Sequence, residues 1–377
     1  MLERRFLKYT DWPLLLVAAL LSCLGLVAVY SATRNLPGGP GPYYYVTRQA
    51  LWLGVGLVVL VAAALWDYRV VVAWGPALLA GSVLLLMAVL LVGPVIAGAR
   101  RWLVLGPINV QPSELAKVAS IAALAWLLSR REEWNGFLPL AAPLALMGIP
   151  VLLVLLEPDL GTSLAFIGIL FVMLYGAGVP AWRLGVLAGL GVAAVLGAAV
   201  VSRLGWVEIL KDYQIQRLVV FLDPAAHRYG AGWNVIQSMI AIGSGQFFGK
   251  GLLGGSQTQL AFLPSRHTDF VFSVVGEEWG FLGASLVLFL YFVLLWRILI
   301  IADQAKDREG RLLALGAFGL IFFHTTVNVG MAVGLLPVTG LPLPFVSSGG
   351  SNVVTSFGAL GLALNVALRR KKLLFDE

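Results

Sequence analysis

Long apolar segments, separated by short polar ones, recur along the whole chain of 377 residues. A helix needs about 20 apolar residues to cross a bilayer, and the pattern predicts ten such spans. Their expected ranges are 13–32, 49–66, 70–92, 112–129, 137–156, 159–178, 181–201, 270–300, 312–335 and 345–368. The pattern therefore predicts an all-α, polytopic membrane protein with one domain over 1–377, in which seven spans (1–201) and three spans (269–377) flank a long polar segment at 202–268.

The composition agrees with this interpretation. Hydrophobic residues make up 59% of the chain and charged residues only 12%, and the mean hydropathy is +0.90. Because a soluble domain carries roughly 25% charged residues, this composition excludes soluble domains and disordered chains. The single cysteine, Cys23, cannot form an intramolecular disulfide, and its apolar surroundings predict a buried, inert thiol.

The distribution of positive charge predicts the orientation. The formal net charge is +7, but the bases lie at the ends of apolar segments, which does not favour a nucleic-acid partner. Cytoplasmic loops are enriched in Lys and Arg, and placing both termini inside puts fourteen bases on the cytoplasmic side against four in the short outer loops. The fourteen are Arg4, Arg5, Lys8, Arg69, Arg130, Arg131, Arg183, Lys306, Arg308, Arg311, Arg369, Arg370, Lys371 and Lys372, and the four are Arg34, Arg48, Arg100 and Arg101.

The segment at 202–268 faces the outside in this topology. Its charged residues alternate with apolar stretches such as 233–242 and 247–253. The mixture is too polar for a span and too apolar for a disordered linker. We therefore expect short amphipathic or re-entrant helices that are joined by glycine turns.

Ionisable residues inside a membrane are costly and suggest function. The fourth span opens with Gln111-Pro112-Ser113-Glu114-Leu115-Ala116-Lys117, in which Glu114 and Lys117 share one helix face. One interpretation is an ion pair that neutralises itself so that the helix can insert. The other is a cation that faces the substrate, with a carboxylate that orients it.

The eighth span follows Arg266-His267-Thr268-Asp269. Thr268 or Asp269 could merely cap that helix. Alternatively, Asp269 could work as a base at the boundary between water and lipid, where the helix N-terminus lowers its pKa and apolar surroundings raise it. With only two other histidines in the chain, we do not expect His267 to belong to a metal cage.

Three further segments are expected on the outer side. The glycine series at 243–251 contains Lys250 but lacks the phosphate-loop pattern, so a nucleotide site is not expected there. Its glycines either let the backbone approach an anionic ligand or simply form flexible turns. Glu157 and Asp159 place two acids in one short loop. The segment 344–352 makes the entry to the last span small and polar, which permits close helix contact or a lined cavity.

Taken together, these motifs resemble the SEDS family (shape, elongation, division and sporulation proteins), and most closely its elongation member. The resemblance covers nearly the whole chain and rests on segments 98–102, 111–117, 157–163, 243–251, 263–272 and 342–351. Two positions depart from the family pattern, because Ser348 replaces a usual Tyr and Ser265 a usual Glu. The resemblance implies a multispanning bacterial glycosyltransferase that polymerises lipid II into peptidoglycan at the outer face of the cytoplasmic membrane.

The resemblance also implies the roles of particular residues. Asp269 would be the catalytic base that takes the proton of the attacking sugar 4-hydroxyl. Cations would stabilise the leaving undecaprenyl diphosphate, with Lys117, oriented by Glu114, as the first candidate. The other expected substrate-binding residues are Arg100, Arg101, Trp102, Lys250, Arg266, His267 and Ser351.

The same resemblance predicts the accessory groups and partners. A divalent metal ion, Mg²⁺ or Mn²⁺, is the one cofactor that this chemistry could use, at residues that remain unknown, and no organic cofactor is expected. The expected partners are lipid II, the undecaprenyl-diphosphate-linked glycan, membrane lipids and a class B penicillin-binding protein. Two other functions fit the same spans, namely a lipid II flippase and a membrane scaffold for a penicillin-binding protein. The ionisable residues gather on the outer half, which favours surface chemistry over transport.

Overall fold

A computed structural model describes residues 9–36, 40–96, 98–106, 108–131, 133–203, 212–227, 229 and 232–369. Every predicted span contains at least one helix, so the all-α prediction is confirmed. The third span is divided at Trp74, and the fifth begins with a 3-10 turn. The helices of the spans are α2 (Trp12–Thr33), α3 (Pro42–Leu65), α4 (Tyr68–Ala73), α5 (Gly75–Val92), α6 (Pro112–Ser129), η1 (Leu138–Leu140), α7 (Ala141–Leu156), α8 (Leu160–Gly176), α9 (Ala181–Arg203), α13 (Val271–Asp303), α14 (Arg308–Ala332) and α15 (Gly350–Arg369).

Eight helical segments in the described part of the chain are long and apolar enough to cross a membrane. Two predicted spans fall outside that set. The helix α8 is apolar but has 17 residues, and α6 carries Glu114 and Lys117. Both lie within the bundle, where α6 contacts α5, α14 and α15, and α8 contacts α7 and α14. The chain is a multi-pass membrane protein.

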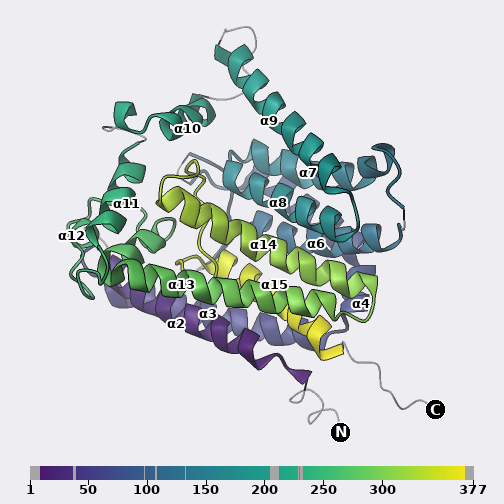
Figure 1. Cartoon of the computed structure of the whole chain (residues 1–377), viewed down its shortest axis with the longest axis horizontal. Helices are drawn as coiled ribbons and strands as arrows, with labels where there is room; N and C mark the ends of the chain where they lie inside the picture. The colour runs from purple at the N-terminus through teal and green to yellow at the C-terminus, as the bar shows by residue number, and fades with distance from the viewer. Residues whose placement is uncertain are drawn as a thin grey trace.

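The apolar surface of the bundle matches a lipid environment. Large hydrophobic side chains such as Phe289, Phe292 and Trp296 are exposed along α13. Cys23 is exposed on α2, so the prediction that its thiol is buried was wrong, because in a membrane protein an apolar position can face lipid as readily as the core. The helix α9 is largely exposed and projects away from the bundle (Figure 1).

The core of the bundle lies around α15, whose helical residues are mostly buried. It packs against α3 at Gly361, where an added Cβ atom would lie 2.6 Å from the Leu60 carbonyl oxygen. The helix α14 lies beside it and contacts α6, α8 and α13. Small residues at such crossings let helix backbones approach closely.

The long polar segment folds into short helices beyond one end of the bundle (Figure 1). These are α10 (Asp212–Leu222), η2 (Ala225–His227), α11 (Trp233–Ser244) and α12 (Ser256–Gln259). Part of the segment, including 204–211, lies outside the described residues. A two-stranded antiparallel hairpin, β1 (Leu103–Leu105) and β2 (Ile108–Val110), follows α5 and was not predicted.

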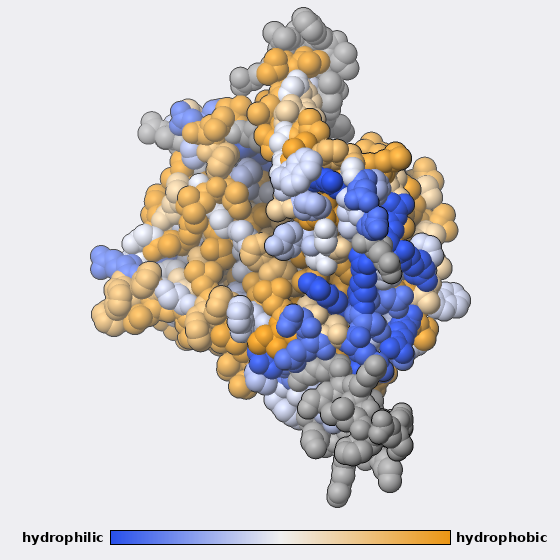
Figure 2. Space-filling view, turned by 45° about the vertical axis from the view of Figure 1, so that its right-hand side comes forward, coloured by the Kyte–Doolittle hydropathy of each residue, from blue (hydrophilic) through white to orange (hydrophobic). Residues whose placement is uncertain are grey.

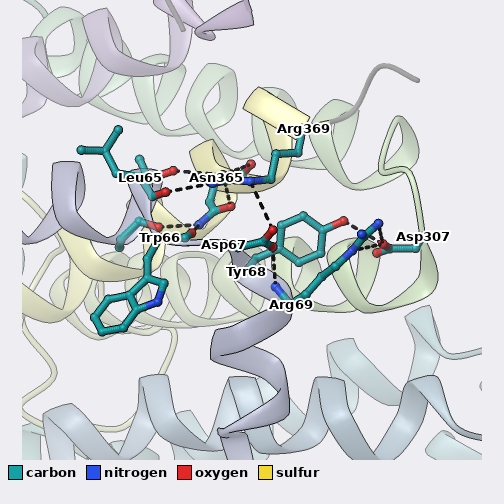
Figure 3. A network of polar contacts seen from close by, with 10 residues as sticks. Leu65, Trp66, Asp67, Tyr68, Arg69, Asp307, Asn365 and Arg369 are labelled. Carbon is teal, nitrogen blue, oxygen red and sulfur yellow. Dashed lines mark hydrogen bonds and ion pairs between the residues drawn. The ribbon is translucent and has the colours of Figure 1, made fainter. Parts of the chain in front are cut away.

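Hydrophilic residues gather at the opposite end of the bundle, which Figure 2 turns toward the viewer. A polar clamp holds the helix ends together there (Figure 3). Asn365 Nδ2 donates to the Ala63 carbonyl at 2.6 Å and also to the Trp66 carbonyl. Arg369 Nη2 donates to the Leu65 carbonyl at 2.8 Å. These donors satisfy carbonyls that the last turn of α3 leaves without helical partners.

Next to the clamp, α4 is tied to the start of α14. Tyr68 Oη donates to Asp307 Oδ2 at 2.8 Å, and Arg69 Nη2 donates to the same oxygen at 3.0 Å. Asp307 is also the N-cap of α14. Several predicted cytoplasmic bases, among them Arg69 and Arg369, therefore join helix ends at this face.

Candidate active site

Asp269 lies where the long polar segment meets the start of α13. Its main-chain N–H donates to the Ser265 carbonyl at 3.1 Å, and its own carbonyl accepts from Asn328 Nδ2 at 2.8 Å. The N-cap of α13 is Phe270, and no side chain makes a capping hydrogen bond there. The alternative that Thr268 or Asp269 caps the helix is therefore wrong, and the Asp269 carboxylate is not used for capping.

The surroundings of Asp269 strengthen it as a base. Burial raises the pKa of its carboxyl from 3.8 to about 6, and the negative charge of Asp159 also raises it. A hydrogen bond to the Thr268 side chain and the positive charges of Arg217 and Arg101 lower it. The carboxyl is still ionised at neutral pH, yet it holds a proton more tightly than an ordinary aspartate, which suits a general base.

The segment after α14 lies against Asp269. An added Cβ atom at Gly340 would lie 3.5 Å from Asp269 Oδ2, and Gly340 has φ of +77°, a conformation that favours glycine. Asn328 Nδ2, which bonds the Asp269 carbonyl, also donates to the Leu341 carbonyl at 2.7 Å. One amide group thus fixes Asp269 and this segment relative to each other.

A chain of polar contacts connects the loops that carry Arg101, Asp159 and Gln111. Arg101 Nε donates to the Glu157 carbonyl at 2.9 Å, and its Nη1 lies 3.9 Å from Asp159 Oδ2. Gln111 Nε2 donates to the same Asp159 oxygen at 3.2 Å, and the Gln111 N–H donates to Ser351 Oγ at 3.2 Å. The predicted site residues Arg101 and Ser351 are therefore joined through Asp159 and Gln111.

Glu157 is the most unusual acid in this group. Its side chain is fully buried, and neither carboxylate oxygen has a hydrogen-bond partner. Burial, assisted by the charge of Asp159, raises its pKa from 4.5 to about 8, against the lowering effect of Arg101. The group is therefore mostly protonated and uncharged at neutral pH.

Lys117 is fully buried and held on both sides. Its Nζ lies 2.7 Å from Glu114 Oε1 and 2.9 Å from His324 Nε2. Asn352 Nδ2 lies 3.4 Å from the other ring nitrogen of His324. The predicted pair of Glu114 and Lys117 therefore forms, but the structure encloses its charges, and a direct contact of Lys117 with substrate remains a prediction.

The helix α14 connects this pair to Asp269. His324 and Asn328 are four residues apart and share one face of the helix. His324 contacts Lys117, and Asn328 bonds the main chain of Asp269. One turn of α14, about 5.4 Å in rise, thus separates the two contacts.

The glycine series packs against a kink in α13. Gly280 interrupts that helix with φ of +64°. An added Cβ atom at Gly249 would lie 2.1 Å from the Glu278 carbonyl oxygen. Lys250 Nζ binds Glu277 Oε1 at 2.9 Å. These glycines therefore allow close backbone approach within the protein, and the charge of Lys250 is paired with a buried carboxylate.

The neighbours of Asp269 in sequence have their own contacts. Arg266 is 2% exposed, and its guanidinium donates to the carbonyls of Ala32 and Asn35 at the end of α2. The ring of His267 lies 5.2 Å from that of Tyr45. Burial and the charge of Arg266 lower the pKa of His267, so its ring is neutral at physiological pH.

Two further predicted residues lie near the hairpin. Arg100 Nη1 donates to the Leu90 carbonyl at 3.1 Å and therefore caps the end of α5. Trp102 is half-buried, and its carbonyl oxygen would lie 3.4 Å from a Cβ atom added at Gly93. Substrate contacts for both residues remain predictions.

Several contacts of the site are not evident from the sequence. Gln111 and Asp159 lie inside predicted motifs, but their link to Ser351 and Arg101 depends on tertiary contacts. His324 and Asn328 carried a detectable signal, because two polar residues four apart in an apolar helix mark one face that avoids lipid. Arg217 belongs to no motif, and only the position of α10 brings it near Asp269.

Metal binding has limited support among the described residues, where no group of three or more His, Cys, Asp or Glu residues is placed to hold a metal ion. Magnesium needs fewer protein ligands, because it is commonly held by one or two carboxylates together with substrate phosphates. Asp159 is a carboxylate near Asp269, but its Oδ1 accepts from the Thr162 N–H at 3.1 Å as the N-cap of α8 and its Oδ2 accepts from Gln111.

The fold and site define a multi-pass membrane protein with a partly buried carboxylate between its helices and its polar loops. Residues 11–372 match the profile of the cell cycle protein family of FtsW, RodA and SpoVE, and the chain belongs to this family. It is 41% identical to the peptidoglycan glycosyltransferase MrdB of Escherichia coli K12 over 97% of this chain and 95% of that one. It is 33% identical to the peptidoglycan glycosyltransferase RodA of Treponema pallidum, over 96% and 98% of the two chains.

Solved structures agree with this assignment. A chain in the structure of a peptidoglycan synthase complex, described for its coordination of polymerisation and crosslinking, superposes with a TM-score of 0.81 at 35% identity. The match covers 98% of this chain and 99% of that one. The crystal structure of the rod shape determining protein RodA of Thermus thermophilus gives a TM-score of 0.71 at 34% identity, over 96% and 98% of the chains.

Proposed function

We propose that this chain is a peptidoglycan glycosyltransferase that polymerises lipid II into glycan strands during cell elongation. The observation that carries the proposal is the position of Asp269. Its carboxyl, with a pKa of about 6, lies where polar loops meet the apolar helix α13. A base at this boundary can reach a sugar in water while the lipid anchor of the same molecule stays in the bilayer.

The reaction is a displacement at the anomeric carbon of the lipid-linked glycan. The 4-hydroxyl oxygen of the acceptor sugar forms a bond to that carbon, and the bond from the carbon to the diphosphate oxygen breaks. Asp269 accepts the proton of the attacking hydroxyl as the new bond forms, and later releases it to water. The bonding electrons leave with undecaprenyl diphosphate, whose negative charge neighbouring cations stabilise.

The buried pair of Glu114 and Lys117 acts in this scheme through α14. The ammonium of Lys117 holds His324, and the same helix face presents Asn328 to the main chain of Asp269. The pair would therefore fix the position of the Asp269 carboxylate relative to the bound substrate. Positioning of this kind supports catalysis because small displacements of a reacting group lower the rate strongly.

The protein would lie in the bacterial cytoplasmic membrane with Asp269 facing outside and both termini inside. Arg69 and Arg369, which the prediction assigns to the cytoplasmic side, belong to α4 and to the end of α15. The helix α4 lies at the end of the bundle opposite the short helices α11 and α12 (Figure 1). This distribution supports the orientation through the enrichment of Lys and Arg in cytoplasmic loops.

The proposed partner is a class B penicillin-binding protein that crosslinks the strands. The structural similarity to a chain of a peptidoglycan synthase complex supports this pairing. If a divalent ion takes part, Asp159 would hold it together with diphosphate oxygens, and the ion would supply additional positive charge to the leaving group.

The experiment is polymerisation of purified lipid II by the full chain with its partner transpeptidase. We expect glycan strands from the wild type and none from Asp269→Ala, with both proteins folded. A second assay measures movement of labelled lipid II across vesicle membranes. Lipid movement without any polymer would indicate a flippase, and polymer that depends only on the partner would indicate a scaffold, so either result would overturn the proposal.

A further inference from the structure

The segment that leads into α15 holds the main chain directly before Asp269. The Ser348 N–H donates to the His267 carbonyl at 2.9 Å, and Ser347 Oγ donates to the Thr268 carbonyl at 2.5 Å. The carbonyl of Asp269 itself accepts from α14. Three consecutive carbonyls are therefore held by donors that lie far away in sequence.

The hydroxyl of Ser347 is used both as acceptor and as donor. Its oxygen accepts from the Leu343 N–H at 2.8 Å, while the Ser347 N–H donates back to the Leu343 carbonyl at 3.0 Å. A hydroxyl has one hydrogen to donate, and here it goes to the Thr268 carbonyl, which can only accept. The turn at 343–347 therefore aims the hydroxyl at the main chain beside Asp269.

A buried glutamine of α3 holds Ser347 from another side. Gln49 Nε2 donates to the Ser347 carbonyl at 3.1 Å, and the Gln49 side chain is buried. Tyr45 lies one turn earlier on the same helix face, and its ring lies 5.2 Å from that of His267. One face of α3 thus contacts both the loop that carries Asp269 and the segment that holds this loop.

The turn at 343–347 is itself rigidly packed. An added Cβ atom at Gly25 of α2 would lie 2.7 Å from the Val346 carbonyl oxygen. Tyr291 of α13 donates to the Pro344 carbonyl. The helices α2, α3 and α13 therefore fix a short non-helical segment, which gives the loop before α13 a rigid support.

We propose that Ser347 is a positioning residue for the glycosyl transfer, which sets the place of the Asp269 carboxylate through the Thr268 carbonyl. Gln49 in turn orients Ser347. The inference rests on the proposed function, since the place of the carboxylate matters only if Asp269 accepts the proton. Ser347 is 1% exposed, so its hydroxyl acts through the main chain and does not touch the substrate. A misplacement of a reacting group by about 1 Å can cost about 100-fold in rate.

A purely structural role of the hydroxyl has different consequences. If Ser347 only closed the turn with Leu343, its loss would lower the melting temperature and leave kcat and KM unchanged at a permissive temperature. A positioning residue instead lowers kcat with little change in KM, because substrate binding does not depend on the exact place of the base. The two constants therefore distinguish the two roles.

The test compares Ser347→Ala with the wild type in lipid II polymerisation by the full chain with its partner transpeptidase. We expect kcat to fall about tenfold and KM to stay within about twofold. Ser82→Ala is the matched control, because it removes a buried hydroxyl that donates to the Leu79 carbonyl within α5, and it should keep both constants.

A second measurement does not depend on turnover. Amide hydrogen exchange over 266–270 reports the opening of the loop, because the three N–H groups at 268–270 donate to the Ser265 carbonyl. We expect this segment to exchange about fivefold faster in Ser347→Ala, and Ser82→Ala to exchange like the wild type.

Gln49→Leu provides an independent variant, since it removes the donor to the Ser347 carbonyl. We expect kcat to fall about threefold when Ser347 is present. When Ser347→Ala is already present, the further loss should be less than about 1.5-fold, because residues that act through one another are not additive.

Several results would overturn the inference. These are a wild-type kcat in Ser347→Ala, a raised KM at constant kcat, unchanged exchange over 266–270, and an undiminished effect of Gln49→Leu in the double variant. A wild type that makes no glycan would reject the proposed function, and the exchange measurement would still decide whether Ser347 holds the loop. An active wild type with unchanged kcat and exchange in Ser347→Ala would reject the positioning role alone.

Discussion

Lys117 and Glu114 form an ion pair whose 2.7 Å contact lies inside the protein, where the Lys117 side chain is fully buried. Removing one partner of such a pair leaves an uncompensated charge in a poorly solvated place, which typically destabilises by about 3–5 kcal/mol. Loss of either partner is therefore expected to destabilise the helix beside the neighbouring site.

We predict that Lys117→Met alone lowers both the melting temperature and the polymerisation rate. The double variant Lys117→Met with Glu114→Gln removes both charges and should recover most of the stability. Thermal unfolding in detergent and lipid II turnover, measured on the same samples, check this. If the double variant is as unstable as the single one, the unpaired charge of Glu114 does not explain the loss of stability in Lys117→Met.

The pH dependence of the reaction should report the Asp269 carboxyl. The base works in its ionised form, so activity is present above a pKa of about 6 and is lost as the pH falls. The initial rate at low lipid II concentration should drop roughly tenfold for each pH unit below that value. A rate that stays constant between pH 7 and pH 5 would contradict the assignment, provided that the protein remains folded.

Glu157 should affect stability more than chemistry. Its folded-state pKa of about 8 lies above the ordinary value of 4.5. As the pH rises, the unfolded chain therefore loses the carboxyl proton of Glu157 at a lower pH than the folded chain does. Its contribution to stability is therefore complete below pH 4.5 and is lost as the pH rises toward 8. Glu157→Gln keeps the shape without the charge, and we expect its melting temperature to fall less than that of the wild type between pH 5 and pH 8. The same decrease in both proteins would be inconsistent with a buried neutral carboxyl.

The clamp at the opposite end of the bundle provides a control that is remote from the site. Asn365→Leu removes the donors to the partly buried carbonyls of Ala63 and Trp66. The loss of such a hydrogen bond costs about 0.5–1.5 kcal/mol, so the melting temperature should decrease while the rate at permissive temperature is retained. A lost rate with unchanged stability would show that this end takes part in turnover.

The sequence predicts the ten spans because their apolar length is a local property of the chain. It also predicts the pairing of Glu114 with Lys117, since residues three apart on a helix share a face. The hairpin at 103–110 was missed because its strands are only three residues long. The exposure of Cys23 was misjudged because apolar sequence alone does not distinguish a lipid-facing position from a core position.

The arrangement of the site required the tertiary structure. Asp269 was selected through a family resemblance and its place at a helix entrance, but the burial that raises its pKa comes from segments far away in sequence. Arg217 lies 52 positions earlier in the chain and reaches the site only because α10 folds over the loop after α14. The pairing of Lys250 with Glu277 likewise depends on the kink at Gly280, which no local pattern indicates.

The most direct test of the central claim is the single-turnover rate of Asp269→Asn with bound lipid II. Asparagine keeps the size of the side chain and cannot accept the proton. The account predicts normal lipid II binding, a normal melting temperature and loss of glycan bond formation by a factor of at least about 100, the lower range for general base catalysis. A variant that binds lipid II and joins the sugars at the wild-type rate would contradict it.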